Sequence, residues 1–323
     1  MATGVIYQPL NMDYPRVWYG QVTIANSSNI QISSNGYVQN YYGSFTYSGS
    51  SLSGGTVTRS DYSEFGQKIY EVSGGAYNAL TVNSYLIYNN PTGLLAYVFY
   101  GNDNISGSSG SDHINGYSGN DFLYGNGGND FIRGGNGNDT IDGGTSIDTA
   151  IFTGNRTNYT QTKTASGWTI NSVAEGVDTI QNVERIKFAD ATVALDTDGV
   201  GGQAYRIYQA AFNRTPDLGG LGYWISVMDG GASLKGVAGG FVGSDEFKST
   251  YGVNPSNLAV VTKLYDNVLH RPGEQGGLDY WVGVLDRRDG TVAEVLAGFS
   301  ESAENQAGVI GVIGNGFTYT PYG

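Results

Sequence analysis

Between residues 98 and 151, one apolar side chain recurs every nine residues in an otherwise polar and glycine-rich stretch. The first six residues of each nine-residue block are rich in Gly, Asn and Ser, which favours a turn. The last three residues carry a single apolar position at their centre, which fits a short strand with one buried side chain. The pattern therefore predicts six turn-plus-strand units. Their apolar positions are Ile105, Ile114, Leu123, Ile132, Ile141 and Ala150.

Units of this kind wind into a right-handed parallel β-roll with two blocks in each coil. Blocks on the same side of the roll then stack at the spacing of neighbouring strands, about 4.8 Å. An aspartate lies two residues before each apolar position, so stacking places these carboxylates in two rows. One row contains Asp103, Asp121 and Asp139, and the other contains Asp112, Asp130 and Asp148.

Carboxylates at this spacing repel one another strongly unless a cation lies between them. Glycine in the turns allows backbone carbonyl groups to point toward the same cation. A flexible set of oxygen ligands without nitrogen or sulfur favours Ca²⁺ over Mg²⁺. The candidate carbonyl ligands are those of Gly107, Gly110, Gly116, Gly119, Gly125, Gly128, Gly134 and Gly137.

The six blocks resemble the calcium-binding nonapeptide repeats of repeats-in-toxin (RTX) proteins. A disordered linker of similar composition would have no reason to keep its Asp and apolar positions in phase. Three stacked loops on each edge leave two gaps per edge, so about four Ca²⁺ ions are expected. The block that begins Val98-Phe99-Tyr100 lacks leading glycines, and Ser146 replaces a glycine in the last block. The outermost sites are therefore expected to be weak or incomplete.

Residues 1–97 predict a small antiparallel β-domain. The segments 41–47, 68–72 and 84–88 are aromatic and β-branched, and Asn, Gly and Ser punctuate them. Residues 94–100 are expected to run into the roll and to form its first coil and cap. The many tyrosines predict cross-strand packing, and an assembly or glycan-stacking face is the alternative.

Residues 152–199 predict a β-hairpin cap, with a linker, that shields the open edge of the last coil. Asp196 and Asp198 follow in the pattern Asp-x-Asp-Gly and are candidates for one further cation. A helix-capping turn is the alternative, because the position that holds glutamate in an EF-hand loop is Tyr205 here.

Residues 200–308 change to a helical pattern that occurs twice. Each copy predicts a helix, a glycine loop, a helix carrying a Tyr-Trp pair and a third helix, with Ser244 and Ser302 at helix starts. Matching positions lie 57 residues apart, as in Tyr208 and Tyr265, Arg214 and Arg271, and Trp224 and Trp281. The Tyr-Trp pairs are expected to pack between helices, and sugar stacking is the alternative.

This region resembles a module known as domain of unknown function 4214, which recurs in bacterial secreted and surface-layer proteins. The resemblance to surface-layer proteins implies attachment to cell-surface polysaccharide. Residues 309–323 form a C-terminal tail. The expected fold class is thus multidomain α+β: an N-terminal β-domain runs into a short parallel β-roll with a β cap, and an all-α repeat domain follows.

Composition and charge exclude several classes of protein. The 323-residue chain has no cysteine, which excludes disulfides and thiolate metal sites. A net charge of −13 without a basic cluster disfavours nucleic acid as a partner, and no apolar run predicts a membrane span. His113 and His270 are the only histidines, so a three-histidine zinc site is excluded, and no Gly-x-Ser-x-Gly motif occurs. The chain is therefore expected not to be an enzyme.

These observations predict a secreted, calcium-binding structural protein at the surface of a Gram-negative-type bacterium. The RTX resemblance, without an N-terminal signal, implies type I secretion directed by residues 309–323. Calcium-induced folding outside the cell is expected to let the chain assemble with itself into a layer or filament. One alternative is a surface-attached adhesin that binds polysaccharide or lipopolysaccharide. Another is an enzyme that uses an unrecognised pair of carboxylates.

Overall fold

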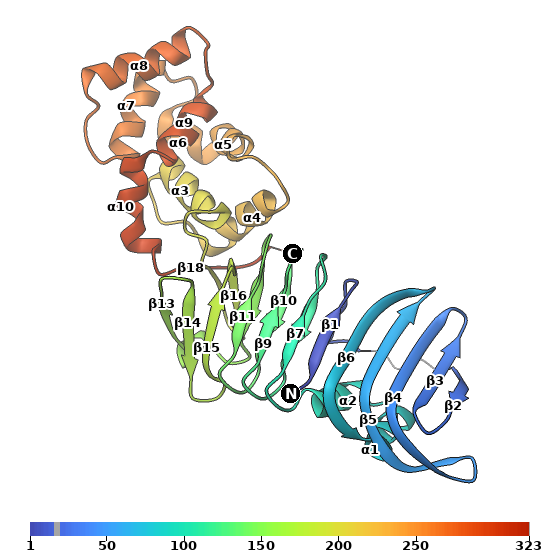
Figure 1. The fold of residues 1–323 in the computed structure, drawn as a ribbon. Coiled ribbons are helices and arrows are strands. Elements are labelled where there is room, and N and C mark those ends of the chain that lie inside the picture. The colour runs from blue at the N-terminus through green and yellow to red at the C-terminus, as the bar shows by residue number, and fades with distance from the viewer. Residues whose placement is uncertain (16–19, 323) are drawn as a thin grey trace. The chain divides into compact units, whose positions relative to one another are not determined.

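The computed structural model describes residues 1–15 and 20–322 and divides into two compact units, Met1–Asp190 and Ala191–Gly323. Strands dominate the first unit and helices the second, so the chain has the predicted α+β class (Figure 1). Residues 16–19 of the predicted N-terminal domain and residue 323 of the predicted tail lie outside the described residues. Within the described ranges, no helix is long and apolar enough to cross a membrane.

Among residues 20–78, all of which the structure describes, five strands form an antiparallel meander. Asn35 and Gly36 form one of its tight turns, and Phe65 and Gly66 form another, all with positive φ between 48° and 89°. Two consecutive residues of this conformation make the turn type whose twist matches that of the flanking strands. The strands are β2 (Gln21–Ala25), β3 (Asn29–Ser34), β4 (Tyr37–Ser48), β5 (Ser51–Glu64) and β6 (Gln67–Asn78).

Two helices follow this sheet where the sequence predicted strands. Segment 84–88 lies in α1 (Ala79–Ile87), and segment 94–100 lies mostly in α2 (Pro91–Val98), so both predictions were wrong. The side chain of Asn78 caps α1 by accepting hydrogen bonds from two backbone N–H groups, and Asn90 caps α2 ahead of Pro91. These caps, together with burial against the sheet, outweigh the strand preference of the aromatic residues.

Strand β1 (Thr3–Ile6) joins the N-terminal meander to the roll. It pairs antiparallel with β6 and parallel with β7 (Asn104–Ser106), so one continuous sheet runs through both regions. No break between compact units therefore occurs at the predicted boundary of residues 97 and 98. The N-terminal segment forms the first coil in place of the predicted residues 94–100, because β1 pairs with β7 and Asn11 bridges to His113 on the second edge.

The repeat region forms two stacks of short parallel strands with a register of 18 residues, or two blocks per coil. One stack contains β7, β9 (Phe122–Tyr124) and β11 (Thr140–Asp142), and the other contains β8 (His113–Asn115), β10 (Phe131–Arg133) and β12 (Thr149–Ile151). All six predicted apolar side chains are at most 2% exposed and form the thin core between the stacks. The predicted parallel arrangement is confirmed.

The segment after the repeats both caps the roll and extends it. After a short 3₁₀ turn (Arg156–Asn158), β13 (Thr160–Lys163) and β14 (Trp168–Ser172) pair as an antiparallel hairpin, as predicted. However, β15 (Gly176–Gln181) pairs parallel with β11, and β16 (Arg185–Lys187) pairs parallel with β12. These two strands therefore add one more coil to the roll.

In its described residues, 191–322, the second unit is a bundle of eight helices between two short strands, and the strands lie near the two ends of this range. Strands β17 (Thr192–Ala194) and β18 (Phe317–Tyr319) pair antiparallel, so part of the predicted tail is a strand. The helices are α3 (Val200–Phe212), α4 (Leu218–Asp229), α5 (Leu234–Gly243), α6 (Asp245–Tyr251), α7 (Asn257–Val268), α8 (Gln275–Asp286), α9 (Val292–Ser300) and α10 (Ala303–Ile313). Since α10 continues past residue 308, the predicted domain boundary there is wrong.

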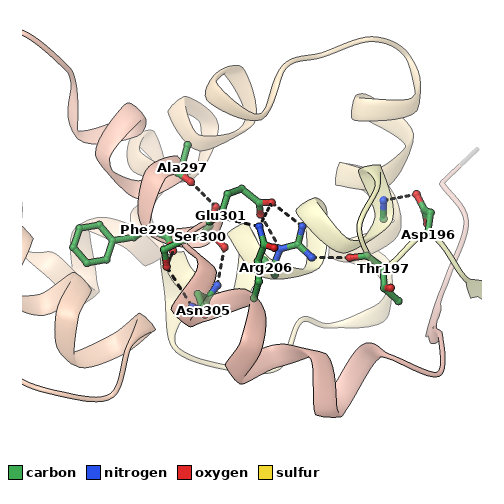
Figure 2. A network of polar contacts seen from close by, with 11 residues as sticks. Asp196, Thr197, Arg206, Ala297, Phe299, Ser300, Glu301 and Asn305 are labelled. Atoms are coloured by element: carbon green, nitrogen blue, oxygen red, sulfur yellow. Dashed lines mark hydrogen bonds and ion pairs between the residues drawn. The ribbon is translucent and has the colours of Figure 1, made fainter.

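The two copies of the helical repeat, α3–α6 and α7–α10, have the same order of helices, and the last helix of each copy is capped by a serine. Ser244 and Ser302 cap α6 and α10, as predicted from the sequence. A deeply buried guanidinium joins two parts of this unit, because Arg206 forms a two-point ion pair with Glu301 and also donates to the carbonyl of Thr197 (Figure 2). This network fixes the segment before α3 against the end of α9.

Candidate metal centre

The predicted aspartates form two hydrogen-bonded ladders inside the roll. Four of the six carboxylates accept, through Oδ1, the backbone N–H of the aspartate one coil earlier, at 2.7–2.8 Å, as in the contact from Asp103 to Asp121. The N-terminal coil contributes to both ladders, since the N–H groups of Ala2 and Leu10 donate to Asp103 and Asp112. All six aspartates are at most 2% exposed: Asp103, Asp112, Asp121, Asp130, Asp139 and Asp148.

The second oxygen of most of these carboxylates is buried without a hydrogen-bond partner. A buried polar atom left unsatisfied costs about 1–3 kcal/mol, and more when it is charged. Asp112 differs, because its Oδ2 accepts from both the backbone N–H and the hydroxyl of Ser108. The oxygens without a partner are Oδ2 of Asp103, Asp121, Asp130, Asp139 and Asp148.

Glycine at the first position of a block leaves room beside the unpartnered oxygens of Asp121 and Asp130. A Cβ atom added to Gly116 would overlap both Asp121 Oδ2 and the carbonyl oxygen of Gly134 in the next coil. The same arrangement recurs at Gly125, where the overlap would involve Asp130 Oδ2 and the next coil's carbonyl. Each space thus brings together one carboxylate oxygen and one backbone carbonyl oxygen.

The predicted glycines at the fourth position of a block differ from those at the first position, because most of them lie against the backbone of a neighbouring loop. A side chain on Gly119, Gly128 or Gly137 would overlap the backbone of the preceding coil, and all three residues have positive φ. Gly110 packs instead against the ring of Pro9 in the N-terminal segment. Glycine at this position therefore permits the close stacking of the loops.

Burial raises the pKa values of these carboxyl groups, and the neighbouring carboxylates add to the effect. The pKa rises to about 7 for Asp121 and Asp130 and to about 6 for Asp139 and Asp148, although the backbone N–H bond to each group opposes the shift. The pKa of Asp103 is also raised by burial. The buried environment thus disfavours the negative charge that these carboxylates carry in water.

A divalent cation that prefers oxygen ligands fits this arrangement. It would supply the partner that the buried Oδ2 atoms do not find within the protein, and it would cancel the repulsion along each row. Among residues 1–15 and 20–322, no three acidic or histidine side chains gather as a metal cluster. Backbone carbonyl oxygens lie beside the carboxylates of Asp121 and Asp130, and a ligand set of carboxylate and carbonyl oxygens is typical of Ca²⁺ rather than of Zn²⁺.

The structure also reveals carboxylates that the sequence analysis missed. Asp178 Oδ1 accepts the N–H of Asp139, and Glu184 Oε2 accepts the N–H of Asp148, both at 2.8 Å, so both ladders continue beyond the repeats. A local signal was present, since Gly176, Asp178 and Ile180 have the spacing of a repeat block. It was missed because the hairpin β13–β14 interrupts the nine-residue period.

The other candidate residues lie outside the ladders. Asp196 Oδ2 accepts the N–H of Gly201 at the start of α3, which is the capping contact named above as the alternative, and Asp198 is exposed. His113 stacks on Phe131 and contacts Asp13, while His270 has a φ of 52° after a helix end. A cation at Asp196 and Asp198 stays an untested prediction.

The Tyr-Trp pairs of the helical repeat divide between core and surface. Trp224 packs over Gly240, and Trp281 packs over Gly298 in the second copy. Their tyrosine neighbours are exposed to solvent, Tyr223 to 39% and Tyr280 to 61%. The tryptophans thus have the predicted packing role. The partly exposed tyrosine rings also make aromatic contacts, Tyr223 with Trp224 and Tyr322, and Tyr280 with Trp281.

Two known sequence families match parts of this chain. The RTX calcium-binding nonapeptide repeat (4 copies) matches residues 97–132 and 116–150, and the domain of unknown function DUF4214 matches residues 204–247 and 238–309. No curated protein matches the chain.

Two solved structures show similarity over a limited part of the chain. The extracellular lipase LipA from Serratia marcescens is 24% identical over 27% of this chain and 14% of the lipase, with a TM-score of 0.26. The AlgE6R3 subunit of the Azotobacter vinelandii mannuronan C5-epimerase is 33% identical over 25% of this chain and 39% of that subunit, with a TM-score of 0.19. This chain therefore spans well under half the length of either structure. Together with the buried aspartate ladders, the family matches identify a chain that carries RTX calcium-binding nonapeptide repeats followed by a DUF4214 domain.

Proposed function

We propose that this protein is an extracellular structural protein whose β-roll folds when it binds Ca²⁺ and that it then assembles with copies of itself. The observation that carries the proposal is the set of five buried Oδ2 atoms without partners in stacked loops, three of which (in Asp121, Asp130 and Asp148) lie beside a backbone carbonyl oxygen of the next coil. Bound Ca²⁺ supplies positive charge and a coordination partner for these atoms. No catalytic step is part of the proposal.

Folding depends on calcium because the two ladders concentrate negative charge in the core of the roll. Without a cation, the buried carboxylates of neighbouring coils, such as Asp121 and Asp139, oppose the stacking of the loops. Extracellular calcium modules bind at roughly 10⁻⁴–10⁻³ M, which lies above the calcium level inside cells. The roll is therefore only marginally stable before export, which suits the proposed type I route, and its folding is completed by calcium outside the cell.

Calcium binding also controls the N-terminal sheet through β1. The backbone of Ala2 donates to Asp103, and β1 pairs on its two sides with β6 and β7. An ordered roll supplies β1 with its second pairing edge at β7, and β1 then connects the meander to the roll. The N-terminal meander is thus expected to join the folded unit only after the roll has formed.

Self-assembly is supported by the edge of the N-terminal sheet. Strand β2 is the end strand of this sheet among the described residues, and all five of its residues are exposed, including Val22 and Ile24. An exposed apolar edge strand offers hydrogen-bonding groups and side chains to another chain. We propose that copies of this protein pair through this region into a layer or filament at the bacterial surface.

Light scattering and negative-stain microscopy of the full chain test this function, first in EGTA and then in millimolar Ca²⁺. Ordered sheets or fibres that form only with Ca²⁺ are the expected result. Val22→Lys combined with Ile24→Lys should abolish the assemblies while far-UV circular dichroism still reports calcium-induced folding. Folded monomers at millimolar Ca²⁺, or assemblies that are unchanged in EGTA, would contradict the proposal.

Polysaccharide binding is the second candidate, and the exposed tyrosines of the helical repeat favour it. Tyr223 and Tyr280 occupy matching positions in the two copies and present their rings to solvent. Aromatic rings of this kind stack on sugar rings. Binding of the full chain to lipopolysaccharide or surface polysaccharide, lost in Tyr223→Ala/Tyr280→Ala, would support this reading, and no binding by the calcium-loaded chain would oppose it.

A further inference from the structure

Residues 175–184 reproduce a repeat coil outside the nine-residue period. Gly176, Asp178 and Ile180 have the Gly-x-Asp-x-Ile spacing of the block at residues 137–141. Their strand pairs with that block in register, with Thr140 opposite Thr179 and Ile141 opposite Ile180. Ile180 is fully buried, as are the apolar residues of the repeats. The hairpin β13–β14 is thus an insertion between the sixth block and a further one.

The loop of this coil stacks by the same contacts as the repeat loops. The N–H of Val177 donates to Asn138 Oδ1, just as the N–H of Asn138 donates to Asn120 Oδ1, each at 2.8 Å. Gly176 has a φ of 94°, and Gly137 donates its N–H to the carbonyl of Glu175. The turn at residues 175–178 therefore has the conformation and the neighbours of a calcium-binding loop.

On the first edge, this coil lies next to a buried oxygen that has no partner. Asp139 is 2% exposed, and its Oδ2 finds no hydrogen bond in the structure. Asp178 is 1% exposed and bonds the backbone of Asp139 through Oδ1. A pair of buried carboxylates in adjacent loops is the arrangement that the repeats show at Asp121 and Asp139.

On the second edge, the same coil supplies a carbonyl oxygen. A Cβ atom on Gly143 would overlap both Asp148 Oδ2 and the carbonyl oxygen of Asn182. Asp148 is fully buried, and its Oδ2 has no partner. The corresponding overlap at Gly125 involves Asp130 Oδ2 and the carbonyl oxygen of Gly143, so the carbonyl of Asn182 has the position that a repeat carbonyl has there. Glu184 follows two residues later and continues the ladder through the N–H of Asp148.

We propose that residues 175–184 act as an additional repeat coil that completes one further Ca²⁺ site on each edge of the roll. Asp139 and Asp178 belong to the site on the first edge, and Asp148, Glu184 and the carbonyl of Asn182 belong to the site on the second. This inference rests on the proposed calcium function and extends it to the cap, whose attachment to the roll then depends on calcium. Neither site follows from the nine-residue repeats alone.

Isothermal titration of the full chain with Ca²⁺ tests the two sites. Asp178→Asn and Glu184→Gln keep an acceptor oxygen for the ladder but remove the charge, so each should bind one ion fewer, or bind one ion at least tenfold more weakly. Asp121→Asn serves as the benchmark for a repeat site. Asp266→Asn removes an exposed carboxylate from α7 and should leave the titration unchanged.

The outcomes separate this inference from the function on which it rests. Unchanged binding in Asp178→Asn and Glu184→Gln, with a lost ion in Asp121→Asn, would overturn the additional sites alone. A wild-type chain that binds no Ca²⁺ would overturn the proposed function as well.

Terbium luminescence provides a second measurement on a chain with intact ladders. Trp168 pairs with Ile180 in the β14–β15 register, and Ile180 is two positions after Asp178 in the sequence. Trp168→Phe should reduce terbium emission excited through tryptophan if a cation binds at Asp178. Emission equal to that of the wild type would place the ions elsewhere and overturn the site on the first edge.

Discussion

Asp139 donates its backbone N–H to Oδ1 of Asp178 at 2.8 Å, across 39 residues of sequence. The same contact joins Asp121 to Asp139 at 2.8 Å across 18 residues. The ladder thus continues through the end of the repeats without a change in geometry. A backbone N–H holds Oδ1 of each carboxylate, and in five of the six repeat aspartates Oδ2 is buried without a hydrogen-bond partner. The stability of the roll therefore depends on the charge of these groups.

Replacing Asp121 by Asn should have opposite effects with and without calcium. The amide keeps the Oδ1 acceptor for Asp103 but removes a buried charge, so the variant should melt at a higher temperature than the wild type in EGTA. At a Ca²⁺ concentration about 100 times the dissociation constant, loss of one site should cost about 2.7 kcal/mol of stability. Thermal unfolding followed by circular dichroism measures both effects. A lower melting temperature in both buffers would show that the charge of Asp121 does not destabilise the calcium-free roll.

Filling one of the spaces beside the ladder should abolish a calcium site. In Gly125→Ala the new methyl group overlaps Asp130 Oδ2 and the carbonyl oxygen of Gly143, so calcium titration should show one ion fewer. Gly308→Ala is the matched control in α10, where a Cβ atom meets nothing within 4 Å. It should leave calcium binding intact and raise stability by up to about 1 kcal/mol, because alanine is the better helix former. Equal calcium binding in both variants would contradict the assignment of the space at Gly125.

Ser146→Gly should stabilise the roll. Ser146 has a φ of 93°, in the left-handed region that glycine occupies at the matching positions 119, 128 and 137. A side chain in that conformation costs roughly 1–2 kcal/mol, so removing it should raise the melting temperature by several degrees in both EGTA and Ca²⁺. Ser146→Ala is the control that keeps the Cβ atom, and it should not recover this gain. A lower melting temperature for Ser146→Gly would mean that the serine side chain itself stabilises the loop.

Acid should stabilise the protein when calcium is removed. Burial, with smaller contributions from neighbouring carboxylates, raises the pKa of Asp121 and Asp130 to about 7 and that of Asp178 to about 8 in the folded chain, compared with about 3.9 in an unfolded chain. Folding thus favours the protonated form, so this contribution to stability is complete below about pH 4 and is lost as the pH rises through the folded pKa values.

The melting temperature in EGTA should therefore increase as the pH is lowered from about 8 to about 5. In saturating Ca²⁺ the trend should be reversed, because protons and calcium compete for the same oxygens. A melting temperature in EGTA that falls steadily over this range would show that other groups dominate the pH dependence.

Removing the buried ion pair of the second unit should cost far more than removing an exposed one. The side chain of Arg206 is 4% exposed and holds Glu301 through two hydrogen bonds, so Arg206→Met should destabilise by about 3–5 kcal/mol. The side chain of Arg214 is 41% exposed in its pair with Glu246, and Arg214→Met should cost at most about 1 kcal/mol. Urea unfolding of the full chain compares the two. Similar losses would show that burial does not determine the strength of these pairs.

The sequence by itself determined the β-roll, because its signal is local and repeated. The nine-residue spacing of Asp103, Asp112 and their successors places every carboxylate relative to the next turn, and the alternating apolar residues can be buried in only one way. The helical duplication was equally visible, since Ser244 and Ser302 mark helix starts by their own chemistry. These features depend on contacts between residues that are close in sequence or in phase with a repeat.

Only the tertiary structure decided where the roll begins and ends. Strand β1 pairs with residues about one hundred positions away, and Asp178 joins a ladder from which the hairpin β13–β14 separates it. The sequence also misjudged α1, because the cap at Asn78 and packing on the sheet outweighed a strand-like composition. Pairings of this kind leave no period in the sequence, because backbone hydrogen bonds between distant strands place little demand on side-chain identity.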